Sequence, residues 1–149
     1  MRSTGLHPWH DIPTGPNPPH VVTAVIEIPT NERNKYELDK TLGLFRLDRV
    51  LHSAVHYPGD YGFLPRTLGD DGDPLDVLVL MTIPVFTGCL VDCRPIGLFH
   101  LIDKGKADEK VLAILAGLLA DFEKKWATER EKRETAERER LRKRFNIPG

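Results

Sequence analysis

Four carboxylates crowd into one segment of the chain that ends where an apolar run begins. They stand within seven residues, at Asp70, Asp71, Asp73 and Asp76. Like charges at close range raise one another's pKa, and closely spaced carboxylate oxygens are the ligands that Mg²⁺ and Ca²⁺ prefer. The ligand pattern of an EF-hand, with its closing glutamate, is absent from the segment. Its composition alone fits a divalent-metal site and a solvated acidic turn equally well.

Further charged residues complete the composition of a phosphate site. Asp103 and Asp108, with Lys110 close behind, follow a long strand-like segment. Cations also stand along earlier strand-like segments, namely Lys35, two residues before Glu37, and Arg49. Each of these alone is typical of an ordinary surface charge. Together, metal-binding carboxylates and inward-facing cations would neutralise a polyanion from both sides, as phosphoryl transfer requires.

Five segments have the β-branched or alternating pattern of strands, and they must position these groups. They are residues 21–28, 35–39, 44–50, 77–81 and 89–103. Turn formers such as Pro58-Gly59 and Gly88 separate them. Successive strands without intervening helical patterns favour a mostly β protein with an antiparallel barrel over a parallel α/β sheet. The proline-rich residues 1–20 predict an irregular N-terminal arm before a barrel domain at 21–122.

A helical pattern follows Lys110. Apolar residues recur there at three-to-four spacing, at Val111, Ile114 or Leu115, Leu118, Phe122 and Trp126. This spacing predicts an amphipathic helix that covers the barrel. Beyond Trp126 the apolar stripe stops, and opposite charges fall four residues apart, as in Arg130 and Glu134. We therefore expect residues 123–149 to be a charged helical tail, solvent-exposed from about 123 to 144.

Composition limits the classes of function. With 149 residues, the chain fits one domain plus extensions. Residues 123–144 carry ten Lys or Arg against six Glu, so a basic tail follows an acidic body and nucleic-acid binding is disfavoured. The apolar stretches are too short to cross a membrane and residues 1–30 lack a signal-peptide pattern, which predicts a cytoplasmic location. Cys89 and Cys93 are expected to be reduced and structural.

Several blocks of sequence resemble one family in the same order. The run DGDPLDV at residues 71–77 resembles the signature of family I soluble inorganic pyrophosphatases at every position. Neighbouring blocks also match, among them HPWHDI, VIEIP, KYELD, LDRV, HYPGDYGFLPRT, RPIGLFHLID and DEKVLA. The resemblance spans about residues 6–114. It implies an OB-type, five-stranded closed barrel with flanking helices, and an enzyme that uses Mg²⁺ to activate water and hydrolyse pyrophosphate to two phosphates.

The resemblance also implies a role for individual residues. Those implied as metal ligands are Asp71, Asp76 and Asp108 for the first Mg²⁺ ions, Asp103 for a further ion, and Glu27 near a peripheral position. Asp73 is implied as the base for the attacking water. Those implied to hold phosphate oxygens are Lys35, Arg49, Tyr61 and Lys110, with Glu37 orienting its neighbours. The family also implies a homo-oligomer.

The match fails after Ala113, which predicts a shortened, divergent C-terminal region. Leu119 and Ala120 stand where the family has a tyrosine and a lysine that bind phosphate. Two alternatives to a working pyrophosphatase therefore stay open. One is a catalytically weakened relative that still binds Mg²⁺ and phosphate, and the other is an OB-type module that binds nucleic acid through the basic tail.

Overall fold

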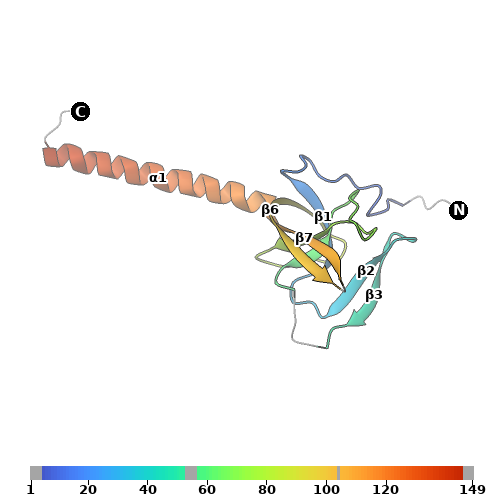
Figure 1. The fold of residues 1–149 in the computed structure, drawn as a ribbon. Helices are drawn as coiled ribbons and strands as arrows, with labels where there is room; N and C mark the ends of the chain where they lie inside the picture. Colours follow the sequence, from blue (N-terminus) through green and yellow to red (C-terminus); the bar gives the residue numbers. More distant parts are fainter. Residues whose placement is uncertain (1–4, 53–56, 104, 146–149) are drawn as a thin grey trace. The chain divides into compact units, whose positions relative to one another are not determined.

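The structure, a computed structural model, describes residues 5–52, 57–103 and 105–145, without the side chains of 103, 106, 118–123 and 145. The chain divides into two compact units, Met1–Ala116 and Gly117–Gly149. The elements are β1 (Val22–Ile28), β2 (Asn34–Asp39), β3 (Leu44–Val50), β4 (Asp60–Phe63), β5 (Asp76–Leu80), β6 (Leu90–Asp103), β7 (Lys106–Leu115) and α1 (Ala116–Phe145). The chain is thus mostly β with one long helix in its described part, as Figure 1 shows.

Five of the strands pair in a closed ring, in the order β1-β4-β5-β7-β6, and β6 returns to β1. Four of these five pairings are antiparallel, but β5 and β7 run parallel, with Asp76 opposite Lys110. The expectation of an entirely antiparallel barrel is therefore wrong. The parallel pairing arises because the long β6–β7 hairpin places β7 beside β5, and the two strands run in the same direction.

The predicted helix start after Lys110 is also wrong, because the chain stays extended to Leu115. Residues 111, 113 and 115 face the core at the two-residue period of a strand: Ala113 is fully buried, and Val111 and Leu115 pack beside it. The same apolar residues also satisfy a three-to-four spacing. Pairing with β5 on one side and β6 on the other decides in favour of the strand.

Strand β4 is short and was not predicted, because Gly62 interrupts its apolar pattern. Gly62 lies opposite Ile26 of β1, and an added Cβ would stand only 1.9 Å from the carbonyl oxygen of Val25. A glycine in a strand often marks such a close backbone approach. The glycine therefore allows β4 to pair closely with β1.

Strand β1 is the centre of the core, because both of its faces are covered. Val22, Ala24 and Ile26 belong to the barrel interior. Val25 faces the other way and packs in a second cluster, which also contains Leu38, Phe63, Trp9, Ile12 and Phe45. The second cluster shows that the N-terminal arm and the β2–β3 hairpin both pack on the outer face of β1.

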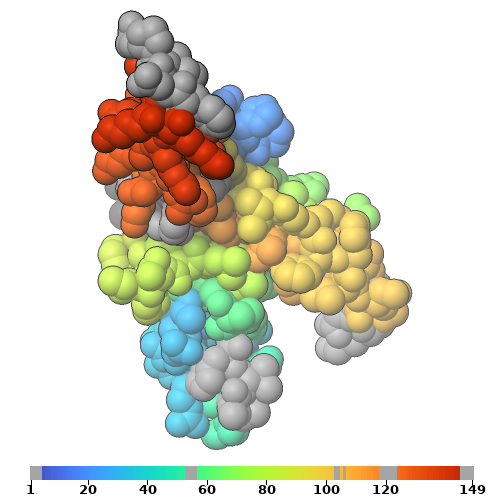
Figure 2. Space-filling model, turned by 90° about the vertical axis from the view of Figure 1, so that its left-hand side faces the viewer, coloured from blue at the N-terminus to red at the C-terminus, as the bar shows by residue number. Residues whose placement is uncertain are grey.

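The β2–β3 hairpin forms a separate two-stranded sheet beside the barrel (Figure 1). Its register places Lys35 opposite Arg49, so both cations lie at the same level of the hairpin. Figure 2 shows an open hollow between this hairpin and the β6–β7 hairpin. The hairpin that contains Lys35 and Arg49 thus borders one side of this hollow, and the β6–β7 hairpin borders the other.

Helix α1 forms the second unit, apart from its first residue. The side chains of residues 124–144 are exposed within this unit. Arg130 and Glu134 approach to 3.9 Å, a separation at which an exposed pair contributes little to stability. Within the described residues, no helix has both the length and the apolar character needed to span a membrane.

Candidate active site

The acidic segment between β4 and β5 is an ordered loop held by its own backbone. The Gly69 N–H donates to the carbonyl oxygen of Asp73 at 2.6 Å, and the Gly72 N–H donates to that of Gly69 at 3.1 Å. Gly72 adopts a φ of 86°, which glycine reaches without strain. The Asp73 N–H donates to Oδ1 of Asp71 at 3.0 Å. These contacts close the loop and orient the Asp71 carboxylate.

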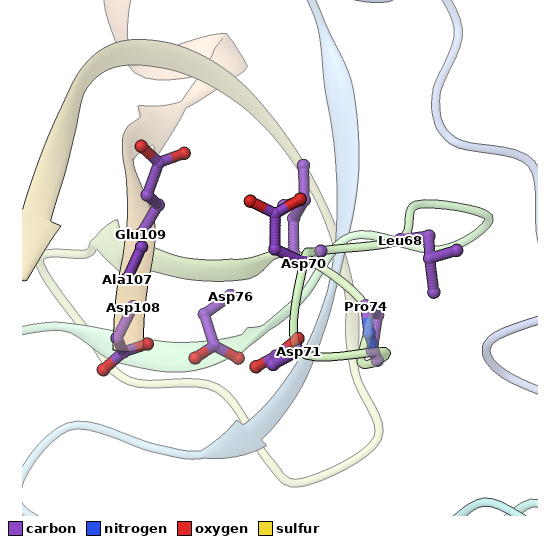
Figure 3. Close-up of a pocket in the computed structure, with 10 residues that line it drawn as sticks. Leu68, Asp70, Asp71, Pro74, Asp76, Ala107, Asp108 and Glu109 are labelled. Carbon is purple, nitrogen blue, oxygen red and sulfur yellow. The ribbon is translucent and has the colours of Figure 1, made fainter. Parts of the chain in front are cut away.

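The loop and the start of β7 border a pocket of about 220 Å³. Its lining includes the carboxylates of Asp70, Asp71, Asp76 and Asp108. In Figure 3, Asp71, Asp76 and Asp108 lie along one border of the pocket, whereas Glu109 points away from them. Alternation along β7 explains the difference, because successive strand residues point to opposite faces. Asp71 of the loop, Asp76 of β5 and Asp108 of β7 therefore meet at one pocket.

Lys110 connects the carboxylates of the two strands. Its Nζ donates to Oδ2 of Asp76 at 2.7 Å, to Oδ1 of Asp108 at 3.0 Å and to Oη of Tyr61 at 3.2 Å. Burial lowers the pKa of Lys110, but its hydrogen bonds to Asp76 and Asp108 outweigh that effect, and the pKa is raised overall. Burial, followed by the charge of Asp76, raises the pKa of Tyr61. Four of the predicted site residues thus form one contact group.

The donor chemistry of the pocket fits a divalent metal, although the ligand set is not assembled. Asp76 and Asp108 both contact one cation, the Lys110 ammonium, and their oxygens are the hard donors that Mg²⁺ prefers. In the described part of the chain, no three His, Cys, Asp or Glu side chains lie close enough together to hold a metal ion. A metal between Asp76 and Asp108 would therefore require the Lys110 ammonium to move aside.

The predicted phosphate-binding cations of the β2–β3 hairpin are engaged with neighbouring carboxylates. Lys35 pairs with Glu37 and lies 3.7 Å from Oδ2 of Asp48, and Arg49 lies 3.6 Å from the same oxygen. Burial lowers the pKa of Lys35, but the hydrogen bond to Glu37 raises it, and the net shift is upward. Asp48 was not predicted as part of the site, although it directly precedes Arg49.

Glu27 lies on β1 and interacts with both the β2–β3 hairpin and Asp76 of the barrel. Its Oε1 accepts a 2.8 Å hydrogen bond from the Leu38 N–H of the hairpin. Burial is the largest cause that raises the pKa of Glu27, to about 7, and the charges of Asp76 and Glu37 add to it. The pKa of Glu27 therefore depends on charges from both the barrel, through Asp76, and the hairpin, through Glu37.

Asp73, the predicted base, has a partner that the sequence did not reveal. The Lys40 ammonium, just after β2, forms an ion pair with Oδ1 of Asp73. The two residues are 33 positions apart, so no local spacing pointed to the pair. Asp103 ends β6, but its side chain lies outside the described part, so the predicted metal role of this residue stays a prediction.

Asp60 is a further residue that sequence reasoning missed. It is fully buried, and it accepts hydrogen bonds from the Thr30 N–H, the Thr30 hydroxyl and the Val85 N–H at 2.8, 2.5 and 2.8 Å. It therefore ties the loop after β1 to the loop after β5. Because β4 was not predicted, no signal in the sequence indicated that Asp60 would be buried.

The surroundings of the two cysteines agree with their predicted structural role. Cys89 and Cys93 are free thiols, and burial raises the pKa of Cys93 to about 12. His100 pairs with Glu109 at 2.8 Å on the exposed face of the β6–β7 hairpin. His7 and His10 stack with ring centroids 4.5 Å apart.

Known proteins are similar to the chain in both sequence and fold. The chain is 53% identical over 115 residues to soluble inorganic pyrophosphatase PPA1 of Solanum tuberosum, an alignment that covers 77% of the chain and 54% of the relative. It is 54% identical over 116 residues to soluble inorganic pyrophosphatase of Oryza sativa subsp. indica, covering 78% of the chain and 54% of the relative. The chain thus spans about half the length of these curated relatives.

A solved structure of an inorganic pyrophosphatase is similar to the fold of this chain. The inorganic pyrophosphatase of Thermus thermophilus superimposes with a TM-score of 0.68 at 50% identity, over 70% of this chain and 60% of that one. The family model described as inorganic pyrophosphatase matches residues 24–146, which include most of β1, the acidic loop, β7 and all of α1. By sequence and by fold, the chain belongs to the inorganic pyrophosphatase family.

Proposed function

We propose that this chain hydrolyses inorganic pyrophosphate to two phosphates and requires Mg²⁺ for the reaction. The observation that carries the proposal is the convergence of Asp71, Asp76 and Asp108 on one pocket, where the Lys110 ammonium contacts Asp76, Asp108 and the Tyr61 hydroxyl. Family membership supports the same activity. The relatives are named for the whole of a chain about twice as long, so the activity of this chain is our inference.

The carboxylates on the barrel side of the hollow would hold the metal. Asp71, Asp76 and Asp108 are the proposed ligands in the pocket, with Asp103 for a further ion and Glu27 at its periphery. When bound, Mg²⁺ supplies Lewis-acid chemistry, which lowers the pKa of coordinated water and offsets charge on the phosphate oxygens.

The cations on the hairpin side would bind the substrate. Lys35 and Arg49 lie at the same level of the hairpin, and both share Asp48 as a partner. A pyrophosphate oxygen would replace that carboxylate, and Glu37 would keep Lys35 oriented through its ion pair. Tyr61 and Lys110 would donate hydrogen bonds from the barrel side.

Asp73 is the proposed general base. Its carboxylate would accept a proton from water as the water oxygen bonds to one phosphorus atom, and the bond from that phosphorus to the bridging oxygen breaks. The electron pair of the broken bond stays with the leaving phosphate. Hydrogen bonds from the Tyr61 hydroxyl, the Lys110 ammonium and the hairpin cations would stabilise the charge that develops there.

The remaining parts of the proposal concern fold type, location and assembly. The pairing order β1-β4-β5-β7-β6 supports an OB-type barrel. The relatives' names, which include the word soluble, support a cytoplasmic location. We also propose a homo-oligomer, and we keep a division into an arm at 1–20, a barrel domain at 21–122 and a tail at 123–149.

A phosphate-release assay with pyrophosphate tests the proposal. We expect release with Mg²⁺ and none after chelation of Mg²⁺. Asp76→Asn, which removes one anionic ligand, should raise the Mg²⁺ concentration that gives half-maximal rate. The exposed Asp92→Asn is the matched control and should behave as the native chain does. Release that is independent of Mg²⁺, or absent at every Mg²⁺ concentration, contradicts the proposed activity.

A weakened relative is the second candidate, and one observation favours it. Leu119 and Ala120 provide no hydrogen-bond donors where a tyrosine and a lysine bind phosphate in the family. Two charge-assisted contacts stabilise by about 1.5–3 kcal/mol each, so their loss could lower catalytic efficiency by a few orders of magnitude. Grafting a family-type segment after Ala113 should restore efficiency, and equal efficiency with and without the graft would contradict this candidate. Nucleic-acid binding finds little support, because the pocket is acidic.

A further inference from the structure

The acidic loop is closed at its base by one threonine. The Thr67 hydroxyl donates to the carbonyl oxygen of Leu64 at 2.6 Å and accepts from the Leu75 N–H at 2.9 Å. The Leu64 N–H also donates to the carbonyl oxygen of Leu75 at 2.9 Å. Thr67 therefore joins the residue before the loop to the residue that precedes Asp76.

The N-terminal arm holds the same threonine from outside the loop. The Trp9 indole N–H donates to the carbonyl oxygen of Thr67 at 2.9 Å, and the Arg66 N–H donates back to the carbonyl oxygen of Trp9 at 2.8 Å. The indole also packs against the cluster of Val25 and Phe63 on the outer face of β1. Trp9 thus links the base of the loop to the rigid core of the barrel.

Arg66 shows that the arm imposes a specific geometry on this turn. Its φ of 54° lies in the left-handed region, which is strained for a residue with a side chain. Its guanidinium donates from Nε to the carbonyl oxygen of His10 at 3.0 Å and from Nη2 to that of Asp11 at 3.1 Å. A strained residue persists when its surroundings fix it, and strain of this kind is concentrated at functional sites.

The arm also reaches the partner of the proposed base. The carbonyl oxygen of Lys40 lies 3.0 Å from Nε2 of His7, and the ammonium of Lys40 pairs with Asp73. The same short segment of the arm therefore contacts the loop at its base, through Trp9, and at its tip, through Lys40. None of these arm residues has a place in the proposed chemistry.

We propose that Trp9 is a positioning residue for the acidic loop: its indole fixes Thr67, and through Thr67 it sets the separation of Asp71 and Asp76 that divalent-metal binding needs. The proposal rests on the metal site of the proposed function. A purely structural arm would contribute to stability without changing metal affinity. A positioning arm changes metal affinity in a chain that stays folded.

Binding of Mn²⁺ without pyrophosphate separates the two roles. Trp9→Phe keeps a ring in the apolar cluster and removes only the indole donor. The matched control is Trp126→Phe on α1, where the side chain is 68% exposed. Free Mn²⁺ is measured by electron paramagnetic resonance well below the unfolding temperature of each variant. Loss of a partner that orients a metal ligand weakens metal affinity by roughly 10–100-fold, and we expect the low end for Trp9→Phe and no change for Trp126→Phe.

A second variant weakens the attachment of the arm to the loop at neighbouring contacts. Arg66→Gly removes the two guanidinium hydrogen bonds to the arm, and glycine adopts a φ of 54° without strain. We expect weaker Mn²⁺ binding again, together with a higher Mg²⁺ requirement and a KM for pyrophosphate within about twofold of the native value, since the hairpin cations are untouched. If Trp9→Phe does not fold, Arg66→Gly decides alone.

The outcomes are distinguishable. Weaker Mn²⁺ binding in a folded variant, with the control unchanged, supports the positioning role. A lower unfolding temperature with native Mn²⁺ affinity overturns it and leaves the proposed activity intact. If the native chain binds no Mn²⁺ and hydrolyses no pyrophosphate, the proposed function and the positioning role are both overturned.

Discussion

Replacement of the buried Asp60 by asparagine and by alanine should destabilise the barrel in two distinct steps. The native carboxylate accepts two hydrogen bonds from Thr30 at Oδ1 and one from the Val85 N–H at Oδ2. Asparagine keeps one acceptor oxygen for Thr30 but turns an amide NH₂ toward the Val85 N–H. One unsatisfied buried donor costs about 1–3 kcal/mol, and we expect the free energy of unfolding to fall by that amount in Asp60→Asn.

Alanine removes every acceptor at the same site. The backbone N–H groups of Thr30 and Val85 and the Thr30 hydroxyl then lose their partner, and we expect a loss of about 3–6 kcal/mol for Asp60→Ala. Since a typical domain is stable by about 5–15 kcal/mol, the alanine variant stands near the limit of folding. Desolvation of the native carboxylate offsets part of the loss, so the lower half of each range is favoured.

Urea-induced unfolding, followed by near-ultraviolet circular dichroism, measures both variants. Asp92→Asn is the control, because Asp92 is exposed and accepts one 2.7 Å hydrogen bond from the Thr23 hydroxyl. Its free energy of unfolding should change by less than about 1 kcal/mol. If the asparagine and alanine variants lose the same free energy of unfolding, or no more than the control does, the stabilising role assigned to the three hydrogen bonds of Asp60 is refuted.

Three further outcomes are expected. Asp73→Asn should abolish turnover and keep pyrophosphate binding, because an amide cannot accept the proton of the attacking water; near-native activity in a steady-state assay would exclude Asp73 as the base. Burial is the main cause that raises the pKa of Glu27 from 4.5 to about 7. Between these two pH values the folded chain keeps a proton that the unfolded chain releases. The free energy of unfolding of the metal-free chain should therefore fall as pH rises from about 4.5 to about 7. Glu27→Gln should flatten that fall in urea titrations, and an unchanged slope would contradict the cause. Truncation after Ala127 should leave the barrel folded, as its circular dichroism would show, and loss of soluble protein would indicate that the tail docks on another subunit.

The strands with a simple pattern were predictable, and those defined by distant partners were not. The predicted segments 21–28 and 44–50 correspond to β1 and β3 almost residue for residue. Strand β7 satisfied two periodicities at once, and only its pairing with β5 and β6 decides between them. The residue pattern of β7 itself does not indicate a parallel partner strand more than thirty residues away.

The candidate site shows the same division. The acidic loop was identifiable as a candidate site from its composition, four carboxylates in seven residues. Lys40 was missed, because the ion pair with Asp73 spans 33 positions and depends on how the β2–β3 turn meets the loop. Thr67 and Trp9 were missed for a different reason: their contribution is a hydrogen bond to backbone, which residue type does not disclose.

The parallel pairing of β5 and β7 links completion of the pocket to closure of the barrel. Strand β7 is the last strand in sequence, and it inserts between β5 and β6. Until it inserts, both neighbours have an unpaired edge, and Val77 and Val79 lack part of their cover. Non-local pairings are slow to form, so the incomplete barrel is the species most exposed to aggregation. Because Asp108 and Lys110 arrive with this strand, closure of the barrel and completion of the pocket are a single event.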